Sequence, residues 1–105
     1  MHNFTVTETR PGALALAGEM TILDAAQIKT ALLQALGAAE QLDIDLSALT
    51  ELDTSGVQLM LMLQREARML DKPLRWVGHS PTATRVLDLL NLGRALDAPA
   101  SVVWS

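Results

Sequence analysis

The chain has 105 residues, of which 50% are hydrophobic, and its eight basic and 12 acidic residues give a net charge of -4. This length and composition predict one folded domain, residues 1–105, with a single core and no disordered segment. The absence of cysteine excludes disulfides, thiol catalysis and cysteine-based metal sites. No stripe of basic residues stands out, so a nucleic-acid partner is not expected.

Targeting and cofactor signals are equally sparse. The first residues lack a basic segment followed by an apolar one, and no apolar stretch approaches the roughly 18 residues of a membrane span. We therefore expect a cytoplasmic protein that does not insert into a membrane. His2 and His79 are the two histidines, too few for a clustered metal site. The glycines lack the spacing of a phosphate-binding loop, so no cofactor is expected.

The N-terminal residues predict a β-hairpin. Residues 4–8 alternate and are rich in β-formers, which indicates a strand. Pro11 and Gly12 predict a turn, and residues 13–17 a second strand ended by Gly18.

A helix and a strand follow the hairpin. From Asp24, apolar residues recur at helical spacing and Gly37 occupies a C-cap position. The positions that define this periodicity are Ala25, Ile28, Leu32, Ala35 and Leu36. Residues 42–46 alternate between apolar and acidic, which predicts a strand leading into a loop at 47–49.

The longest predicted helix runs from Ser55 to about residue 70 and is stopped by Pro73. Its C-terminal end is rich in cations, which the helix dipole favours there: Arg65, Arg68 and Lys72. A short strand is predicted at 74–77, bounded by Gly78.

Ser80 and Pro81 then predict an N-cap and first helical residue, with the third helix ending at 91–94 and a last strand at 101–104. The apolar face of this helix consists of Val86, Leu87 and Leu90. The order β-β-α-β-α-β-α-β predicts an α/β domain in which a hairpin is joined to parallel crossovers.

The junction Asp53-Thr54-Ser55-Gly56 carries the chemistry of the chain. Ser55 with Gln58 fits a capping box, and Asp53 or Thr54 could cap the helix instead after a small shift of its boundary. Alternatively, Ser55 is a phosphorylation switch, because a phosphate there meets N–H donors and the positive end of the helix dipole. Gly56 would leave the hydroxyl accessible, and Asp53 would repel the phosphate. Both roles are compatible if Ser55 caps the helix in one state and carries phosphate in the other.

The helix after this junction is apolar on nearly every side over residues 57–63. Such a helix is usually buried in the core. One flank could instead be exposed to a partner, since methionines are common on adaptable surfaces.

Catalytic interpretations have little support. Ser55, His79 and an aspartate could be drawn as a triad, but Ser55 lacks a Gly-x-Ser-x-Gly elbow. Asp43 and Asp45 share one strand face, where a solvated or loop-facing pair is expected rather than an acid/base pair. We therefore expect a non-enzymatic protein.

The chain resembles the STAS domains, specifically the bacterial anti-sigma factor antagonists. The resemblance covers about residues 4–104. It rests on Gly18-Glu19, Ile44-Asp45-Leu46-Ser47, Asp53-Thr54-Ser55-Gly56-Val57, Ser80-Pro81 and Leu89-Leu90-Asn91-Leu92. The Asp-Thr-Ser-Gly element is the most specific of these, because it follows such a strand and opens such a helix.

The resemblance implies a single STAS-like domain, with a mixed sheet flanked by helices on one side. It implies that Ser55 is phosphorylated by a serine kinase that doubles as an anti-sigma factor, with Thr54 a lesser candidate. The unphosphorylated protein would bind that kinase and a phosphatase would restore this state. The partner-binding residues would be Asp53, Thr54, Ser55, Gly56, Val57 and Gln58, with Asp53 positioning Ser55 or contacting the kinase.

Other members of the family suggest alternatives. Single STAS domains also serve in chemotaxis-type signalling and as a subunit that braces the ABC ATPase of lipid-transport complexes. The lipid-transport type often has a small residue in place of the serine, so Ser55 favours the antagonist. The family often carries a fourth helix after the last strand, whereas here only Ser105 follows Trp104, unless residues 95–100 substitute for it.

Overall fold

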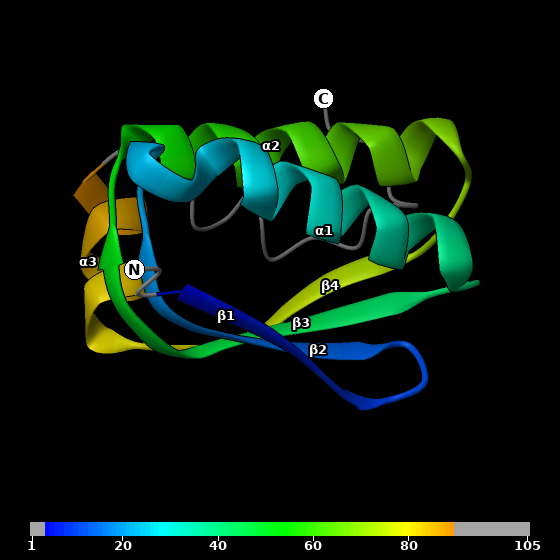
Figure 1. The fold of residues 1–105 in the computed structure, drawn as a ribbon, viewed down its shortest axis with the longest axis horizontal. Helices are drawn as coiled ribbons and strands as arrows, with labels where there is room; N and C mark the ends of the chain where they lie inside the picture. The colour runs from blue at the N-terminus through cyan, green and yellow to red at the C-terminus, as the bar shows by residue number, and fades with distance from the viewer. Residues whose placement is uncertain (1–3, 90–105) are drawn as a thin grey trace.

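The fold is a mixed four-stranded sheet with two helices on one face, shown by a computed structural model that describes residues 4–89 (Figure 1). The sheet has the order β1-β2-β3-β4, in which β1 and β2 are antiparallel and the other neighbours are parallel. The strands are β1 (Phe4–Arg10), β2 (Ala13–Met20), β3 (Leu42–Leu52) and β4 (Leu74–His79). The helices are η1 (Ile22–Asp24, a 3₁₀ turn), α1 (Ala25–Ala38), α2 (Thr54–Met69) and α3 (Pro81–Leu89).

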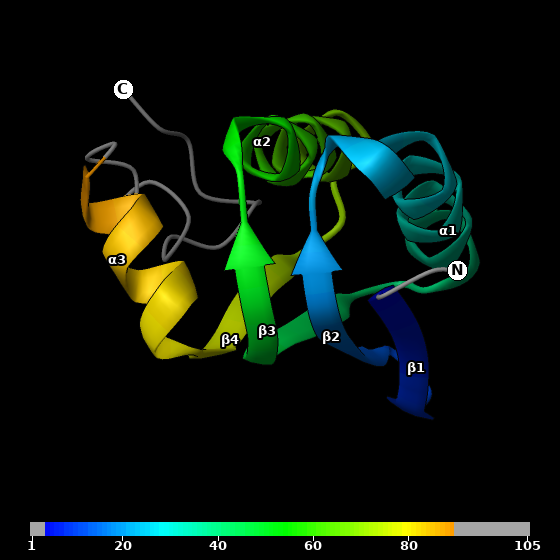
Figure 2. The same ribbon diagram turned by 60° about the vertical axis from the view of Figure 1, so that its left-hand side comes forward.

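This architecture confirms the predicted α/β domain. The helices α1 and α2 lie side by side over one face of the sheet, whereas α3 lies at one end of the sheet, against β3 and β4 (Figure 2). The α3 start follows prediction, because Ser80 Oγ accepts from the Ala83 N–H at 3.0 Å and Pro81 is the first helical residue. The predictions for 91–94, 95–100 and 101–104 lie outside the described residues.

The strands are longer than predicted. Gly18 does not end β2, which continues to Met20 through an irregularity that Gly18 permits with a φ of 94°. The predicted loop at 47–49 is part of β3, whose pairing with β2 runs on to Met20 and Leu52. After residue 46 the buried positions of β3 are three residues apart instead of two. A search for two-residue alternation therefore does not detect this part of the strand. Similarly, β4 passes Gly78 because His79 still pairs with Leu46.

The end of α1 also differs from prediction. Gly37 lies within the last turn rather than at the C-cap, and the helix ends at Ala38. The Lys72 ammonium donates to the carbonyls of Leu36 and Gly37 at 2.8 and 3.2 Å. A cation from the loop after α2 therefore caps α1, so no glycine is needed at that point.

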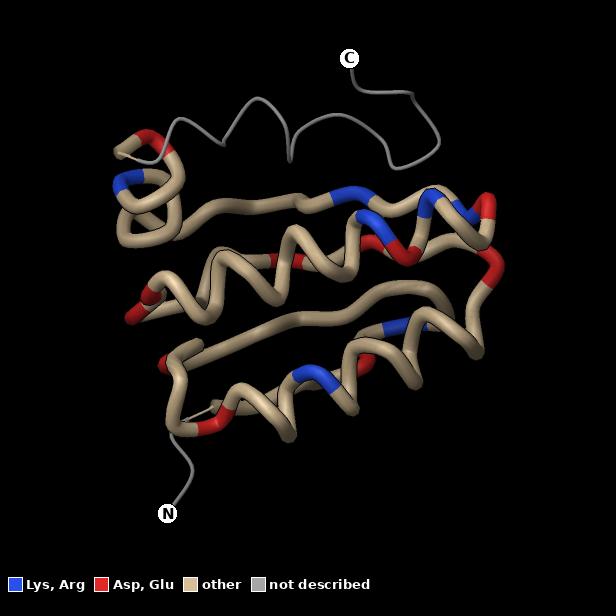
Figure 3. The backbone as a smooth tube through the Cα atoms, turned by 90° about the horizontal axis from the view of Figure 1, so that it is seen from above, with Lys and Arg blue, Asp and Glu red and all other residues tan. Residues whose placement is uncertain are grey.

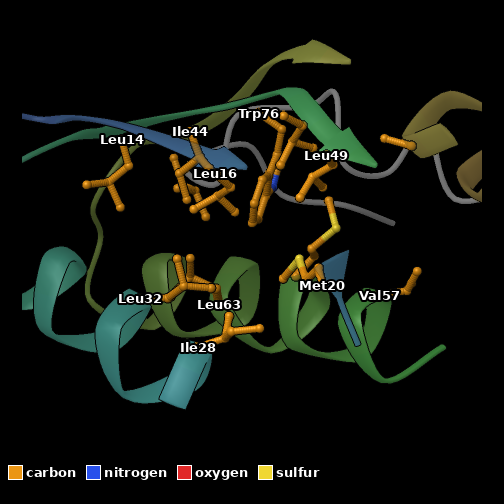
Figure 4. Close-up of a cluster of buried hydrophobic side chains, with 14 of the residues drawn as sticks. Leu14, Leu16, Met20, Ile28, Leu32, Ile44, Leu49, Val57, Leu63 and Trp76 are labelled. Atoms are coloured by element: carbon orange, nitrogen blue, oxygen red, sulfur yellow. The ribbon is translucent and has the colours of Figure 1, made fainter. Parts of the chain in front are cut away.

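The core fills the space between the sheet and the two helices (Figure 4). Side chains from the strands and from the helices meet there, among them Leu14, Leu16, Ile44, Ile28, Leu32 and Leu63. Trp76 is buried as well, and its Nε1–H donates to Gln64 Oε1 at 2.8 Å, so this indole is satisfied.

The apolar helix after the junction belongs to this core. Val57, Met60 and Leu63 are buried, which confirms the core interpretation for these three positions of the segment 57–63. The remaining apolar residues of the segment, Leu59, Leu61 and Met62, are half-buried.

Candidate functional site

Asp53, not Ser55, caps α2. Its Oδ1 accepts from the Gly56 N–H at 3.0 Å. The Asp53 N–H still donates to the Met20 carbonyl at 3.3 Å, which holds Asp53 in the extended conformation that an N-cap requires. The predicted capping box of Ser55 and Gln58 is therefore wrong, and the alternative that placed the cap at Asp53 is right. The continuation of β3 to Leu52 decides this, because it fixes where the helix can begin.

The second carboxylate oxygen of Asp53 joins α2 to a distant segment. Oδ2 accepts from the Ile22 N–H of η1 at 3.0 Å, across 31 positions of sequence. One side chain thus fastens the 3₁₀ turn that precedes α1 to the start of α2. Figure 1 shows these two starts next to each other at the same end of the molecule.

Ser55 is the second residue of α2 and its side chain is partly accessible. Since Asp53 supplies the cap, the Ser55 hydroxyl is not the cap acceptor. Thr54 and Gln58 are exposed on the same first turns, whereas Gly56 and Val57 are buried. A partner that approaches this turn therefore meets Thr54, Ser55 and Gln58, while Val57 belongs to the core.

Gly56 allows α2 to pack closely against the ends of two strands. A Cβ at this position would lie 2.5 Å from the Met20 carbonyl oxygen and 2.7 Å from Leu52 Cδ1. Both distances are shorter than van der Waals contact permits. Gly56 therefore has a packing role that the sequence did not predict, in addition to the accessibility of the Ser55 hydroxyl that the sequence suggested.

The end of the molecule around this site is acidic (Figure 3). Glu19 and Glu51 are register partners on β2 and β3, and Asp24 and Asp53 follow the same strand ends. A hollow of about 250 Å³ adjoins Asp53, and Arg85 of α3 brings a cation to its lining. The other residues that line it are Thr21, Thr50, Glu51, Leu52 and Thr82.

Ser55 and His79, the two residues that could be drawn into a catalytic triad, lie at different places along the sheet. His79 is the register partner of Leu46 on β3. Six more residues of β3, 47–52, separate Leu46 from the junction that leads to Ser55. The topology thus gives no support to a hydrolase.

The aspartates of β3 have structural partners. Asp43 lies at the surface and is paired there: Arg75 donates to its carboxylate at 3.0 and 2.8 Å, and Arg10 lies 3.6 Å away. The hydrogen bond from Arg75, with the positive charges of both arginines, lowers the Asp43 pKa from its usual value despite partial burial. Asp45 Oδ1 accepts from the Ser47 N–H at 2.8 Å.

Within residues 4–89, no group of acidic or histidine side chains is arranged to hold a metal ion. Nor does any helix in this part of the chain have the length and apolar character needed to cross a membrane.

The fold and the site together define a small α/β domain whose distinctive surface is one helix start after its third strand. The chain belongs to the STAS domain family, because residues 4–99 match the family model described as Mlab, STAS domain. The resemblance inferred from the sequence is thereby confirmed at the level of the family. No curated protein sequence matches the chain.

Several solved structures share the fold. The anti-sigma factor antagonist SpoIIAA in its unphosphorylated form has a TM-score of 0.69 and 24% identity, over 90% of this chain and 87% of that one. The Bacillus cell fate determinant SpoIIAA in its phosphorylated form gives 0.65 and 25%, over 90% of each chain. An anti-sigma factor antagonist from Mycobacterium paratuberculosis gives 0.72 and 21%, over 89% of this chain and 80% of that one.

Proposed function

We propose that this chain is a phosphorylation-switched binding module of the anti-sigma factor antagonist type. In its unphosphorylated form it binds a serine kinase that doubles as an anti-sigma factor, in the bacterial cytoplasm, and so regulates transcription. Phosphorylation of Ser55 releases the kinase, and a phosphatase restores the binding form. The chain itself catalyses no reaction.

One observation carries this proposal: the fold places Ser55 on the first turn of α2 and assigns the cap to Asp53. The hydroxyl can therefore be modified without loss of the cap. Membership of the STAS family and the likeness to SpoIIAA, which has been solved in unphosphorylated and phosphorylated forms, support the same function.

The physical effect of the phosphate would be local. It adds about -1.5 to -2 charges and three acceptor oxygens. At the N-terminus of α2 the helix dipole tolerates this charge, so the domain stays folded. An interface that surrounds Ser55 would nevertheless be lost, because it cannot accommodate the bulk of the phosphate or desolvate its charge.

The test is phosphate transfer from ATP by the purified serine kinase encoded nearest to this gene, with mass-spectrometric mapping. We expect phosphate on Ser55 and none on Ser55→Ala, whereas Thr54→Ala and Ser47→Ala remain substrates. Phosphorylation or Ser55→Asp should weaken kinase binding at least tenfold in calorimetric titration. Ser55→Ala should stay within about 0.5 kcal/mol of the parent in unfolding free energy, because it does not remove the cap. Absence of phosphate from Ser55, or undiminished binding by Ser55→Asp, would refute the switch.

The subunit of a lipid-transport ABC complex is the alternative, and the family model that matches is not described as an antagonist. That function predicts co-purification with an ABC ATPase, and the same affinity for it after Ser55→Ala. A chemotaxis-type signalling role instead predicts that the kinase partner belongs to a chemotaxis system.

A further inference from the structure

Two large apolar side chains are exposed beside the start of α2. Ile22 and Leu23 expose 68% and 87% of their surface, and the 3₁₀ turn η1 that carries them has no buried residue. Covering such side chains with a partner is favourable, because it removes apolar surface from water. Folding does not bury these two side chains, so a partner that covers them would gain this free energy on binding.

These side chains are held in place rather than displayed on a loose loop. The Ile22 N–H donates to Asp53 Oδ2 at 3.0 Å, and the Asp24 N–H closes the turn on the Thr21 carbonyl at 3.2 Å. Asp53 is also the cap of α2. Asp53 therefore joins the backbone of the turn that carries the apolar pair to the first turn of α2. Because the backbone is already ordered there, little of its conformational entropy would be lost on binding.

The charge around this surface has one predominant sign. The elements that meet here carry four acidic residues: Glu19, Asp24, Glu51 and Asp53. Glu19 on β2 is the register partner of Glu51 on the neighbouring strand β3. Like charges in register do not stabilise a sheet. Most cations of the described chain lie beyond the middle of α2 or toward the other end of the sheet (Figure 3): Arg10, Arg65, Arg68, Lys72 and Arg75. Arg85 of α3 is an exception, because it lines the hollow beside Asp53.

We propose that Ile22 and Leu23 are the apolar anchors of the kinase-binding surface, and that they enter an apolar cleft edged by lysines or arginines. This rests on the proposed function for the identity of the partner. Apolar anchors supply affinity and the surrounding carboxylates supply orientation and rate of association. A phosphate on Ser55 stands beside the anchors and keeps them from seating, because of its bulk and the cost of desolvating it.

The experiment measures kinase affinity by calorimetry for the full chain and for Ile22→Ala and Leu23→Ala. Met69→Ala is the matched control, since Met69 is 73% exposed at the far end of α2. We expect at least a tenfold loss, equivalent to about 1.4 kcal/mol, for Leu23→Ala and a smaller loss for Ile22→Ala. Met69→Ala should bind like the parent. Affinity of the parent should fall as salt is raised, and Glu51→Gln should reduce that dependence.

The outcomes separate this inference from the proposed function. If Leu23→Ala binds the kinase like the parent and is still phosphorylated on Ser55, the anchor role of Ile22 and Leu23 is refuted. The proposed phosphorylation switch is not affected by that result. An equal loss in Met69→Ala also refutes the anchor role. Affinity independent of salt overturns the basic-edged cleft. No binding or phosphorylation of the parent refutes the proposed function itself, and with it the identity of this partner.

Discussion

Replacement of Asp53 tests the central contact of the site. Asp53→Ala removes the cap on the Gly56 N–H and the bond from the Ile22 N–H. Loss of an N-cap costs about 1 kcal/mol, and a hydrogen bond to a charged acceptor contributes a further amount on the order of 1 kcal/mol. We therefore expect the unfolding free energy to fall by about 2 kcal/mol, which leaves most domains of this size folded.

Asp53→Asn separates the two bonds. Asparagine caps helices about as well as aspartate, so its oxygen can keep the Gly56 bond. Its amide then faces the Ile22 N–H, donor against donor, and that bond is lost. We expect about 1 kcal/mol of destabilisation, half that of Asp53→Ala.

The assay is urea unfolding followed by far-ultraviolet circular dichroism. Glu51→Ala is the control, because it removes one carboxylate from the same acidic end and is expected to change stability by no more than about 0.5 kcal/mol. The reasoning is refuted if Asp53→Ala stays within that margin, or if Asp53→Asn is as unstable as Asp53→Ala.

Two further predictions concern packing and pH. Gly56→Ala should destabilise the fold by up to about 2 kcal/mol in the same assay, because overpacking against Met20 exceeds the gain in helix propensity. Gly37→Ala, with nothing within 4 Å of its Cβ, should stabilise by roughly 0.5–1 kcal/mol, so equal effects at both glycines would contradict the packing argument. The lowered pKa of Asp43 implies stability that is present above its ordinary value of 3.8 and lost as pH falls through the folded value. The stability advantage of the parent over Asp43→Asn should therefore shrink on acidification below about pH 4, and a constant difference between pH 7 and pH 2.5 would contradict the pairing with Arg75.

Local patterns identified most elements of this fold. The hairpin, the helical periodicity from Asp24, the cap at Ser80 and the apolar helix after residue 53 each depend on residues close together in sequence. Their type could be predicted because turn chemistry, capping and amphipathic spacing act over a few positions. The sequence also placed the candidate site at residues 53–58, on the basis of the Asp-Thr-Ser-Gly element.

What the patterns missed depends on partners distant in sequence. The loop expected at 47–49 is strand because β2 pairs with it, and Lys72 caps a helix that ended 34 positions earlier, at Ala38. Local propensity does not include hydrogen bonds from distant segments. The predicted ends of β3 and of α1 were wrong for this reason.

The sequence by itself determined the order of elements and the serine beside glycine at a helix start. Only the tertiary structure decided which residue caps that helix and what lies next to it. Asp53 becomes the cap because β3 runs on to Leu52, and the same carboxylate brings Ile22 and Leu23 to the side of Ser55. Both outcomes come from contacts between segments about 30 positions apart, and such contacts exist only once the chain is folded.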